Sequence, residues 1–171
     1  MARLVFVFLI ALSLLICGVS FAVEKKTSCL ICGMEQEKFG HTWMVIEYED
    51  GTTKGFCSIH CAAIELAQSL DKTPKSIKVG DYNTKKLIDA ERAFWVIGGS
   101  KMGVMTKRAK FAFENKEDAE KFMKENGGTP ATFDDAMKAA YEDMYADTKM
   151  IREKRKMMKE KMMKEKMMEH K

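Results

Sequence analysis

The stretch TWMVIEYEDGTTKGFCSIHCAAIELAQSL, residues 42–70, changes partway from a strand-like to a helix-like composition. Thr42 to Tyr48 is β-branched and aromatic, and Asp50-Gly51 is a strong hairpin turn signal. Thr52 to Phe56 would return antiparallel to the first strand. A serine shortly after this return can cap a helix from about Ile59 to Leu70. The stretch therefore predicts a strand–strand–helix (ββα) unit.

The same order of elements recurs downstream. Phe94 to Ile97 is typical of a strand, and Lys107 to Phe113 alternates polar with apolar residues, as a half-buried strand does. A helix is expected from Lys116 to about Asn126, and Gly127-Gly128 would end it. The sequence thus predicts a second ββα unit.

The two ββα units, at about residues 29–72 and 92–128, decide the expected fold class. Each unit is too small to bury a core alone. We therefore expect an α+β fold in which the two units pack as one domain over residues 23–130. Residues 74–93 would connect the units.

The N-terminal segment is typical of a signal peptide. Leu4 to Leu15 is an almost unbroken apolar run, and Ser20-Phe21-Ala22 supplies small residues for cleavage. A cysteine at the end of such a run, Cys17, is a lipoprotein feature, but the residue before it is the bulky Ile16. We expect residues 1–22 to be a cleaved signal peptide, with a lipid anchor at Cys17 less favoured. The mature protein would be periplasmic or lie on the outer face of the membrane.

The C-terminal segment, residues 131–171, is rich in methionine and lysine. Thr132 and Asp135 resemble a capping box that starts a helix. Residues 157–168 repeat Met-Met-Lys-Glu-Lys with a period of five, which turns the methionine pairs of a helix in three directions. Such a pattern does not pack on a core, so we expect a solvated tail, helical or disordered.

The charge of this tail limits the class of partner. Residues 149–171 carry ten Lys or Arg against four Glu, whereas the whole chain has a net charge of only +4. A basic tail can contact an anionic membrane surface. No aromatic residue is interleaved with these lysines, which argues against a nucleic-acid partner.

Four cysteines form two closely spaced pairs, Cys29 with Cys32 and Cys57 with Cys61. In an exported protein such pairs are usually disulfides. The same spacing is also a reasonable structural zinc pattern, and a Cys-x-x-Cys turn suits thiol–disulfide exchange. The cysteines alone leave these interpretations open.

Methionine shifts the balance toward copper. The chain has 15 methionines, and Met34 follows Cys32 by two residues. Thioether sulfur selects Cu(I) among the common biological metals. Met102 and Met105 lie in the predicted loop of the second unit and can complete a Cys–Met site, although filling gaps in a core is the commoner role of methionine.

Two further sets of side chains are candidate ligands. His41 and His60 offer ring nitrogens, although a lone histidine is more often a polar surface residue. The tail offers paired thioethers four residues apart, which share a helical face and can collect copper weakly. These tail residues are Met157, Met158, Met162, Met163, Met167 and Met168.

Several short motifs of this chain, and their order along it, resemble the NosL family of copper-binding accessory proteins. The resemblance covers residues 29 to 128 and rests on Cys32-Gly33-Met34, Phe56-Cys57, Gly103-Val104-Met105, Ala112-Phe113, a helix with Ala119 and Phe122, and Gly127-Gly128. It implies a fold of two ββα units and a role in assembling nitrous oxide reductase. It also implies that Cys32 and Met34 bind Cu(I), with Met105 as a completing ligand.

The function predicted from these features is binding rather than catalysis. No catalytic triad, phosphate loop or paired-carboxylate site is apparent, so we do not expect an enzyme. We expect an exported Cu(I) metallochaperone whose partner is an extracytoplasmic copper enzyme or a copper transporter. The alternative is a small exported zinc-binding or thiol–disulfide protein that uses the two cysteine pairs. A lipid-binding adaptor acting through the tail is a third hypothesis.

Overall fold

The computed structural model describes residues 27–169. The predicted signal peptide, residues 1–22, and with it Cys17, lies outside this range. Within the range, no helix is both long enough and apolar enough to cross a membrane. The elements in chain order are α2 (Gln36–Phe39), the 3₁₀ turn η1 (Gly40–Thr42), β1 (Met44–Tyr48), β2 (Thr53–Phe56), α3 (Ile59–Gln68), β3 (Pro74–Gly80), β4 (Leu87–Asp89), β5 (Phe94–Ile97), β6 (Lys110–Phe113), α4 (Lys116–Asn126), β7 (Thr129–Ala131) and α5 (Phe133–Glu169).

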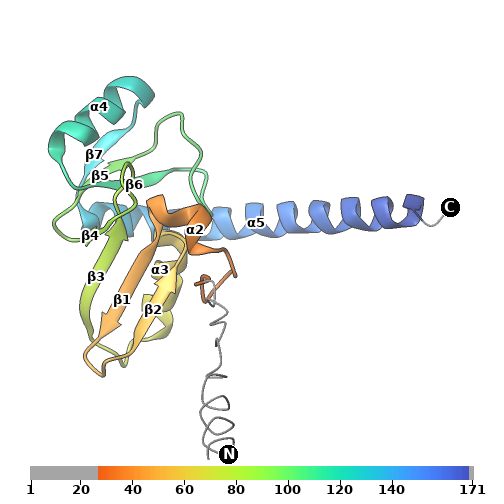
Figure 1. Ribbon diagram of the computed structural model, residues 1–171, viewed down its shortest axis with the longest axis horizontal. Coiled ribbons are helices and arrows are strands. Elements are labelled where there is room, and N and C mark those ends of the chain that lie inside the picture. The colour runs from red at the N-terminus through yellow and green to blue at the C-terminus, as the bar shows by residue number, and fades with distance from the viewer. Residues whose placement is uncertain (1–26, 170–171) are drawn as a thin grey trace, which may run out of the picture.

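The first sheet is antiparallel, with strand order β2-β1-β3-β4 (Figure 1). Its hairpin pairs Met44 with Phe56 across the predicted turn. Because side chains alternate across a strand, Met44, Ile46 and Tyr48 all point into the core. The predicted hairpin and the helix after it are present, and that helix ends at Gln68, two residues before the predicted end.

The segment that we expected to connect the two units is itself part of the first sheet. β3 pairs with β1 along its length, and β4 pairs with β3. The prediction missed β3 because the strand begins with a proline, a residue that favours edges and turns. Gly80, its last residue, lies so close to the carbonyl oxygen of Gly40 that a Cβ there would overlap it. This contact brings η1 against the end of β3.

The second sheet has strand order β6-β5-β7, and α4 packs on it. β5 and α4 have the predicted bounds, and Gly127 ends α4 with a φ of 73°. The strand predicted over Lys107 to Phe113 is shorter, because it begins at Lys110. β7 was not predicted; it pairs with β5 through a three-residue stretch that contains Pro130.

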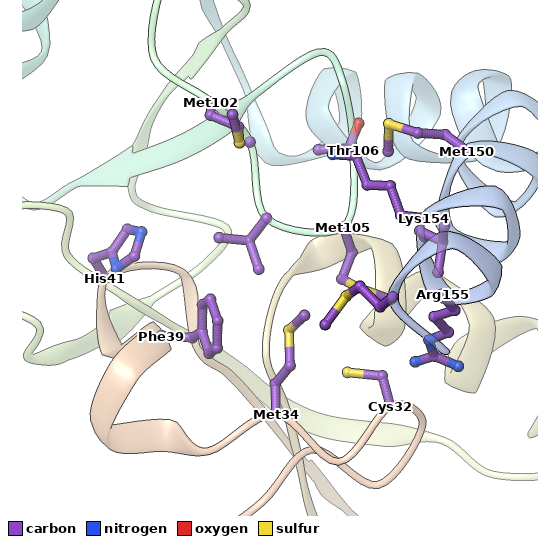
Figure 2. A pocket seen from close by; sticks show the side chains of 14 residues that line it. Cys32, Met34, Phe39, His41, Met102, Met105, Thr106, Met150, Lys154 and Arg155 are labelled. Carbon is purple, nitrogen blue, oxygen red and sulfur yellow. The ribbon is translucent and has the colours of Figure 1, made fainter. Parts of the chain in front are cut away.

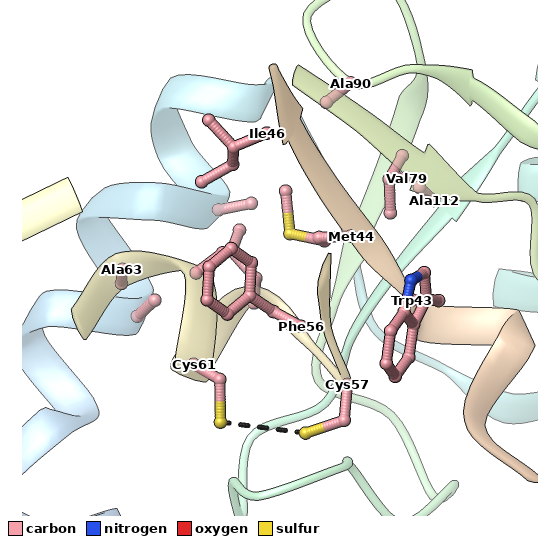
Figure 3. Packing of buried hydrophobic residues seen from close by; sticks show 14 of the residues in the cluster. Trp43, Met44, Ile46, Phe56, Cys57, Cys61, Ala63, Val79, Ala90 and Ala112 are labelled. Carbon is pink, nitrogen blue, oxygen red and sulfur yellow. Dashed lines mark hydrogen bonds between the residues drawn. The ribbon is translucent and has the colours of Figure 1, made fainter. Parts of the chain in front are cut away.

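The two sheets share one core. One cluster of buried side chains combines Met44 of the first sheet, and Trp43 just before it, with Trp95 of the second sheet. Phe133 and Ala136 of α5 complete the same cluster. Figure 3 shows part of it, with Met44 and Phe56 in its interior. The two units therefore pack together in the α+β fold that the sequence predicts.

Helix α5 covers this core with its first turns and then extends away from it (Figure 1). The predicted capping box is present: Thr132 Oγ1 accepts a hydrogen bond from the Asp135 amide (3.2 Å), and the Asp135 carboxylate accepts one from the Thr132 amide (2.9 Å). Of the two forms expected for the tail, the structure shows a helix through residue 169.

A network of charged groups ties α5 to the chain before β6. Lys110 is buried, and its ammonium group donates to the Asp143 carboxylate (2.7 Å) and to the carbonyl oxygen of Arg108 (2.9 Å). Arg108 also pairs with Asp143 (2.8 Å) and with the exposed Glu142 (3.1 Å). Burial raises the pKa of Asp143, but the hydrogen bonds from Arg108 and Lys110 outweigh burial and hold it below its usual range.

We predict that Asp143→Ala lowers the free energy of unfolding by about 3 kcal/mol, because it leaves the buried Lys110 ammonium without its counter-charge. The melting temperature should fall by roughly 10 °C in a thermal denaturation followed by circular dichroism.

Glu142→Ala is the matched control for Asp143→Ala, because it removes a carboxylate from the same network at an exposed position. Its cost should stay below about 1 kcal/mol. Equal losses in the two variants would contradict a role for the buried ion pair.

Candidate metal site

Four cysteine sulfurs converge at the edge of the shared core. The Sγ atoms of Cys29, Cys32, Cys57 and Cys61 all lie within 4.8 Å of one another. Cys57 Sγ is 3.4 Å from Cys32 Sγ and 3.6 Å from Cys61 Sγ (Figure 3 draws the latter contact). All four are free thiols. The group, called here the thiol cluster, has the number and type of ligands that can bind a soft or borderline metal ion.

The turn that carries Cys29 and Cys32 is shaped by its own backbone. The amide of Gly33 donates to the carbonyl of Cys29 (2.8 Å), and the amide of Cys29 donates to the carbonyl of Met34 (2.8 Å). Gly33 has a φ of 80°, which glycine adopts at little cost. The amide of Leu30 then donates to the carbonyl of Gly55 in β2 (3.2 Å), which attaches the turn to the first sheet.

The other two cysteines follow from the hairpin. Cys57 comes directly after β2, and Cys61 lies in the first turn of α3. Both side chains are fully buried. Since a strand end and a helix start meet here, two cysteines four residues apart point to the same place.

Exposure and acidity differ across the thiol cluster. Cys32 is half-buried, whereas the other three are buried. Cys29 raises the pKa of Cys32, but hydrogen bonds from Cys57 and Cys61 outweigh this and lower it to about 7. Hydrogen bonds from the other thiols, Cys32 first, also hold the pKa of Cys29 below its ordinary value. The cluster therefore favours thiolate at the Cys-x-x-Cys turn.

The protons of the thiol cluster are retained on its innermost members. Hydrogen bonds donated to Cys29 and then Cys32 raise the pKa of Cys57, and the same two partners raise the pKa of Cys61. Burial acts in the same direction on both groups, because it disfavours a charged sulfur.

A cavity of about 620 Å³ opens beside Cys32, between the Cys-x-x-Cys turn, the loop before β6 and helix α5. In Figure 2 the side chains of Cys32, Met34 and Met105 point into the same space. We call this cavity the methionine pocket. Its lining comprises Cys32, Met34, Phe39, His41, Met102, Gly103, Val104, Met105, Thr106, Met150, Ile151, Lys154, Arg155 and Met158.

The backbone around Met105 is strained in a way that directs its side chain. Met105 has a φ of 60°, a left-handed conformation that side-chain-bearing residues rarely adopt. Gly103 lies so close to Thr106 and Ala109 that a Cβ there would come within 3.0 Å of them. The Lys107 amide donates to the Asp147 carboxylate (3.0 Å), which holds this loop against α5. Strain of this kind is commonly kept at functional sites.

The two histidines have different surroundings. His41 lies at the edge of the methionine pocket beside Tyr82, with ring centroids 5.8 Å apart. Burial, and then the charge of Lys85, lower its pKa, so the ring is neutral at pH 7 and able to offer a lone pair. His60 is buried and faces Asp147, with 3.8 Å between Nδ1 and Oδ2. Within residues 27–169 it is not part of the metal-ligand cluster.

The other methionines that were predicted as copper ligands lie at the edge of the pocket or outside it. Met102 lines the pocket but is 81% exposed. Of the six methionines predicted to collect copper, Met158 alone lines the pocket. The others lie along the exposed surface of α5: Met157, Met162, Met163, Met167 and Met168.

Sequence reasoning missed the contribution of α5 to the pocket. Met150, Ile151, Lys154 and Arg155 all line it. They fall three and four residues apart, which places them on one helical face. This spacing can be seen in the sequence. The five-residue repeat that follows it, however, gives no sign of how far along the helix the pocket-lining face extends.

The fold and its thiol cluster define a small α+β protein with a cysteine-rich site able to bind a metal ion. The model of the NosL family matches residues 20–141, and the chain belongs to that family. The predicted resemblance is thereby confirmed. The predicted tail lies mostly beyond the matched residues.

A solved structure with a similar fold is the copper chaperone NosL from Shewanella denitrificans. The match has a TM-score of 0.51 at 24% sequence identity and covers 66% of this chain and 91% of the other. This likeness supports the fold assignment. A comparison with curated proteins found no match.

We predict that iodoacetamide modifies Cys32 before the other described cysteines in the reduced, metal-free protein, because its sulfur is the most accessible of the four. The rate should rise with a midpoint near pH 7, as the thiolate forms. Peptide mapping by mass spectrometry between pH 5.5 and 8.5 measures the order of labelling. Modification of Cys57 or Cys61 at the same rate would contradict the arrangement of the cluster.

Proposed function

We propose that this protein is an exported Cu(I) metallochaperone. The observation that carries this proposal is the position of Cys32, which belongs to the thiol cluster and also lines the methionine pocket. One thiolate is thus shared between a buried set of sulfurs and a set of thioethers open to the surface.

The chemistry of the pocket favours Cu(I) over harder metal ions. The side chains of Met34 and Met105 point into the same space as that of Cys32 (Figure 2). Thioether sulfur is a poor ligand for Zn²⁺, whereas it suits Cu(I). We propose that Cys32, Met34 and Met105 bind one Cu(I) ion in a low-coordinate site, with His41 or Met102 as an additional donor.

The arrangement also suits transfer of the ion. A site with few ligands leaves room for an incoming sulfur to bind before an outgoing one leaves. The Sγ atoms of Cys29, Cys57 and Cys61 lie within 4.8 Å of Cys32 Sγ, so we propose that they act as alternative ligands that replace the thioethers when the ion moves into the thiol cluster. Cys32 would then pass Cu(I) between the buried thiol cluster and the pocket by ligand exchange.

The partner proposed for this protein is inferred from its family and not from the geometry of the pocket. NosL proteins are associated with the assembly of nitrous oxide reductase, and we propose an extracytoplasmic copper enzyme of this kind, or a copper transporter, as the partner. The predicted signal peptide supports a location in the periplasm or on the outer face of the membrane. A site built for binding supports a carrier rather than an enzyme.

We further propose that the distal part of α5 collects copper weakly. Met162 lies four residues after Met158, and Met167 lies four residues after Met163, so each pair shares a helical face. All four side chains are more than half exposed. The ten basic residues of this segment also favour contact with an anionic membrane surface.

A second candidate function rests on the thiol cluster alone. Four sulfurs within 4.8 Å of one another match the ligand set of a structural zinc site. In that case Met34 and Met105 would be dispensable for metal binding, and chelation would unfold the protein. A thiol–disulfide function would instead use the accessible Cys32 as the attacking thiolate.

We predict that the reduced protein binds one tight equivalent of Cu(I) and that Met34→Leu weakens it by more than about 10-fold. Even groups that only orient a metal ligand are worth about 10- to 100-fold in affinity, so losing a ligand should cost at least as much. An anaerobic competition titration against a chromophoric Cu(I) chelator measures this, with Zn²⁺ titrated in parallel.

Met123→Leu is the matched control for Met34→Leu, because Met123 packs against a separate cluster of buried side chains that includes Phe111 and Phe122 and does not line the pocket. It should leave Cu(I) affinity unchanged. A chain ending at Lys159 should keep the tight equivalent and lose only weak ones. Tight zinc binding that does not change in Met34→Leu would favour the zinc site instead.

A further inference from the structure

The methionine pocket is far larger than a bare metal ion requires. A Cu(I) ion bound by three sulfurs fills a space no bigger than its own coordination sphere, whereas the open pocket has a volume of about 620 Å³. Pockets of about 300 to 1,000 Å³ are typical of small-molecule ligands. The space beside Cys32 therefore has room for an ion together with the molecule that carries it.

Two cationic side chains line this pocket, whose other lining residues are mostly apolar or contain sulfur. Lys154 and Arg155 line it from α5 (Figure 2). Neither forms an ion pair with any residue between 27 and 169. By contrast, Arg108 in the loop before β6 and Lys110 at the start of β6 are paired with acidic groups of the same helix. The positive charge at the pocket is thus available to an incoming anion.

The position of the two cations relative to the sulfurs defines the chemistry of the ligand. An ion bound at Cys32, Met34 and Met105 would share the pocket with the cationic groups of Lys154 and Arg155 (Figure 2). Met150 lies one turn before Lys154 on α5 and also lines the pocket. A suitable ligand has a soft-metal end and an anionic end.

We propose that the methionine pocket admits Cu(I) as a small anionic thiolate complex, which Lys154 and Arg155 bind through its carboxylates while its copper reaches Cys32. This inference rests on the proposed function of the Cys32 site and adds the form in which copper arrives. It also gives α5, whose pocket-lining residues lie beyond the part matched by the family model, a role in loading.

The transfer step is a ligand exchange without redox change. A bond forms between Cys32 Sγ and copper, and a bond between copper and one carrier thiolate breaks. The proton of the Cys32 thiol goes to the departing carrier sulfur, and the second carrier thiolate leaves as Met34 and Met105 bind. Copper remains Cu(I) throughout.

The test compares two copper donors and two charge variants. The anionic donor is Cu(I) bound by the tripeptide thiol glutathione, and the other is the cationic Cu(I)–acetonitrile complex. Loading is followed by stopped-flow absorbance of the copper–thiolate band under anaerobic conditions at low salt. The test variant is K154Q/R155Q, and the matched control is K164Q/K166Q, which removes the same charge farther along α5.

We expect K154Q/R155Q to slow loading from the glutathione complex by about 10-fold, the lower end of electrostatic acceleration of association. The difference should disappear at high salt and should be absent with the acetonitrile donor. K164Q/K166Q should load at the wild-type rate from both donors. Melting curves of both variants confirm that each is folded.

Two results would overturn the inference. Equal slowing in both variants would mean that the overall charge of the helix attracts the donor, and unchanged loading in K154Q/R155Q would mean that the two cations take no part. In either case, tight Cu(I) binding by the wild type would leave the proposed function intact. Failure of the wild type to take Cu(I) from either donor would overturn both.

Discussion

The packing of both sheets against the first half of α5 is the constraint on which the rest of the structure depends. Trp43 directly precedes β1 of the first sheet and Trp95 lies in the second sheet, yet both are buried in one cluster with Phe133 of the helix. This shared core decides where the Cys-x-x-Cys turn, the loop before β6 and the helix meet. The methionine pocket lies at their junction, so its geometry is a consequence of core packing.

Polar contacts then hold the segments around the pocket in the positions that core packing gives them. The buried Lys110 needs Asp143 as its counter-charge, and the loop amide of Lys107 needs Asp147. Both acceptors lie on α5, so the loop that carries Met105 is held to the helix at two points. Trp43 packs directly over Gly55, whose carbonyl accepts the hydrogen bond from Leu30. The thiol cluster is thereby attached to the same rigid frame.

Much of the fold could be predicted from local signals. The Asp50-Gly51 turn, the strand Phe94 to Ile97 and the glycine after α4 each have a strong local pattern, and the structure has all three. β3 was missed because its pairing with β1 is a long-range interaction and its first residue is a proline. β7 was missed for a similar reason, since three residues around Pro130 show no strand period.

The site was predictable in its ligand types but not in its arrangement. Spacing identified Cys29, Cys32, Cys57 and Cys61 and left open whether they form disulfides; only the tertiary structure brings the four free thiols together. His60 is the opposite case, a candidate ligand that the tertiary structure directs away from the thiol cluster. It is adjacent to Cys61 in sequence, but the helix turns its ring toward Asp147. The contribution of Met150 and Lys154 depends on how far α5 runs along the domain, which no local pattern reveals.

A Cu(I) site at Cys32, Met34 and Met105 is tested most directly by X-ray absorption spectroscopy at the copper edge of the protein loaded with one equivalent of Cu(I). Such a site should show about three sulfur ligands, and the combined substitutions Met34→Leu and Met105→Leu should change this sulfur shell. A shell of four sulfurs that is unchanged by the two substitutions would contradict it. The thiol cluster alone would then hold the metal, and the methionine pocket would not be a copper site.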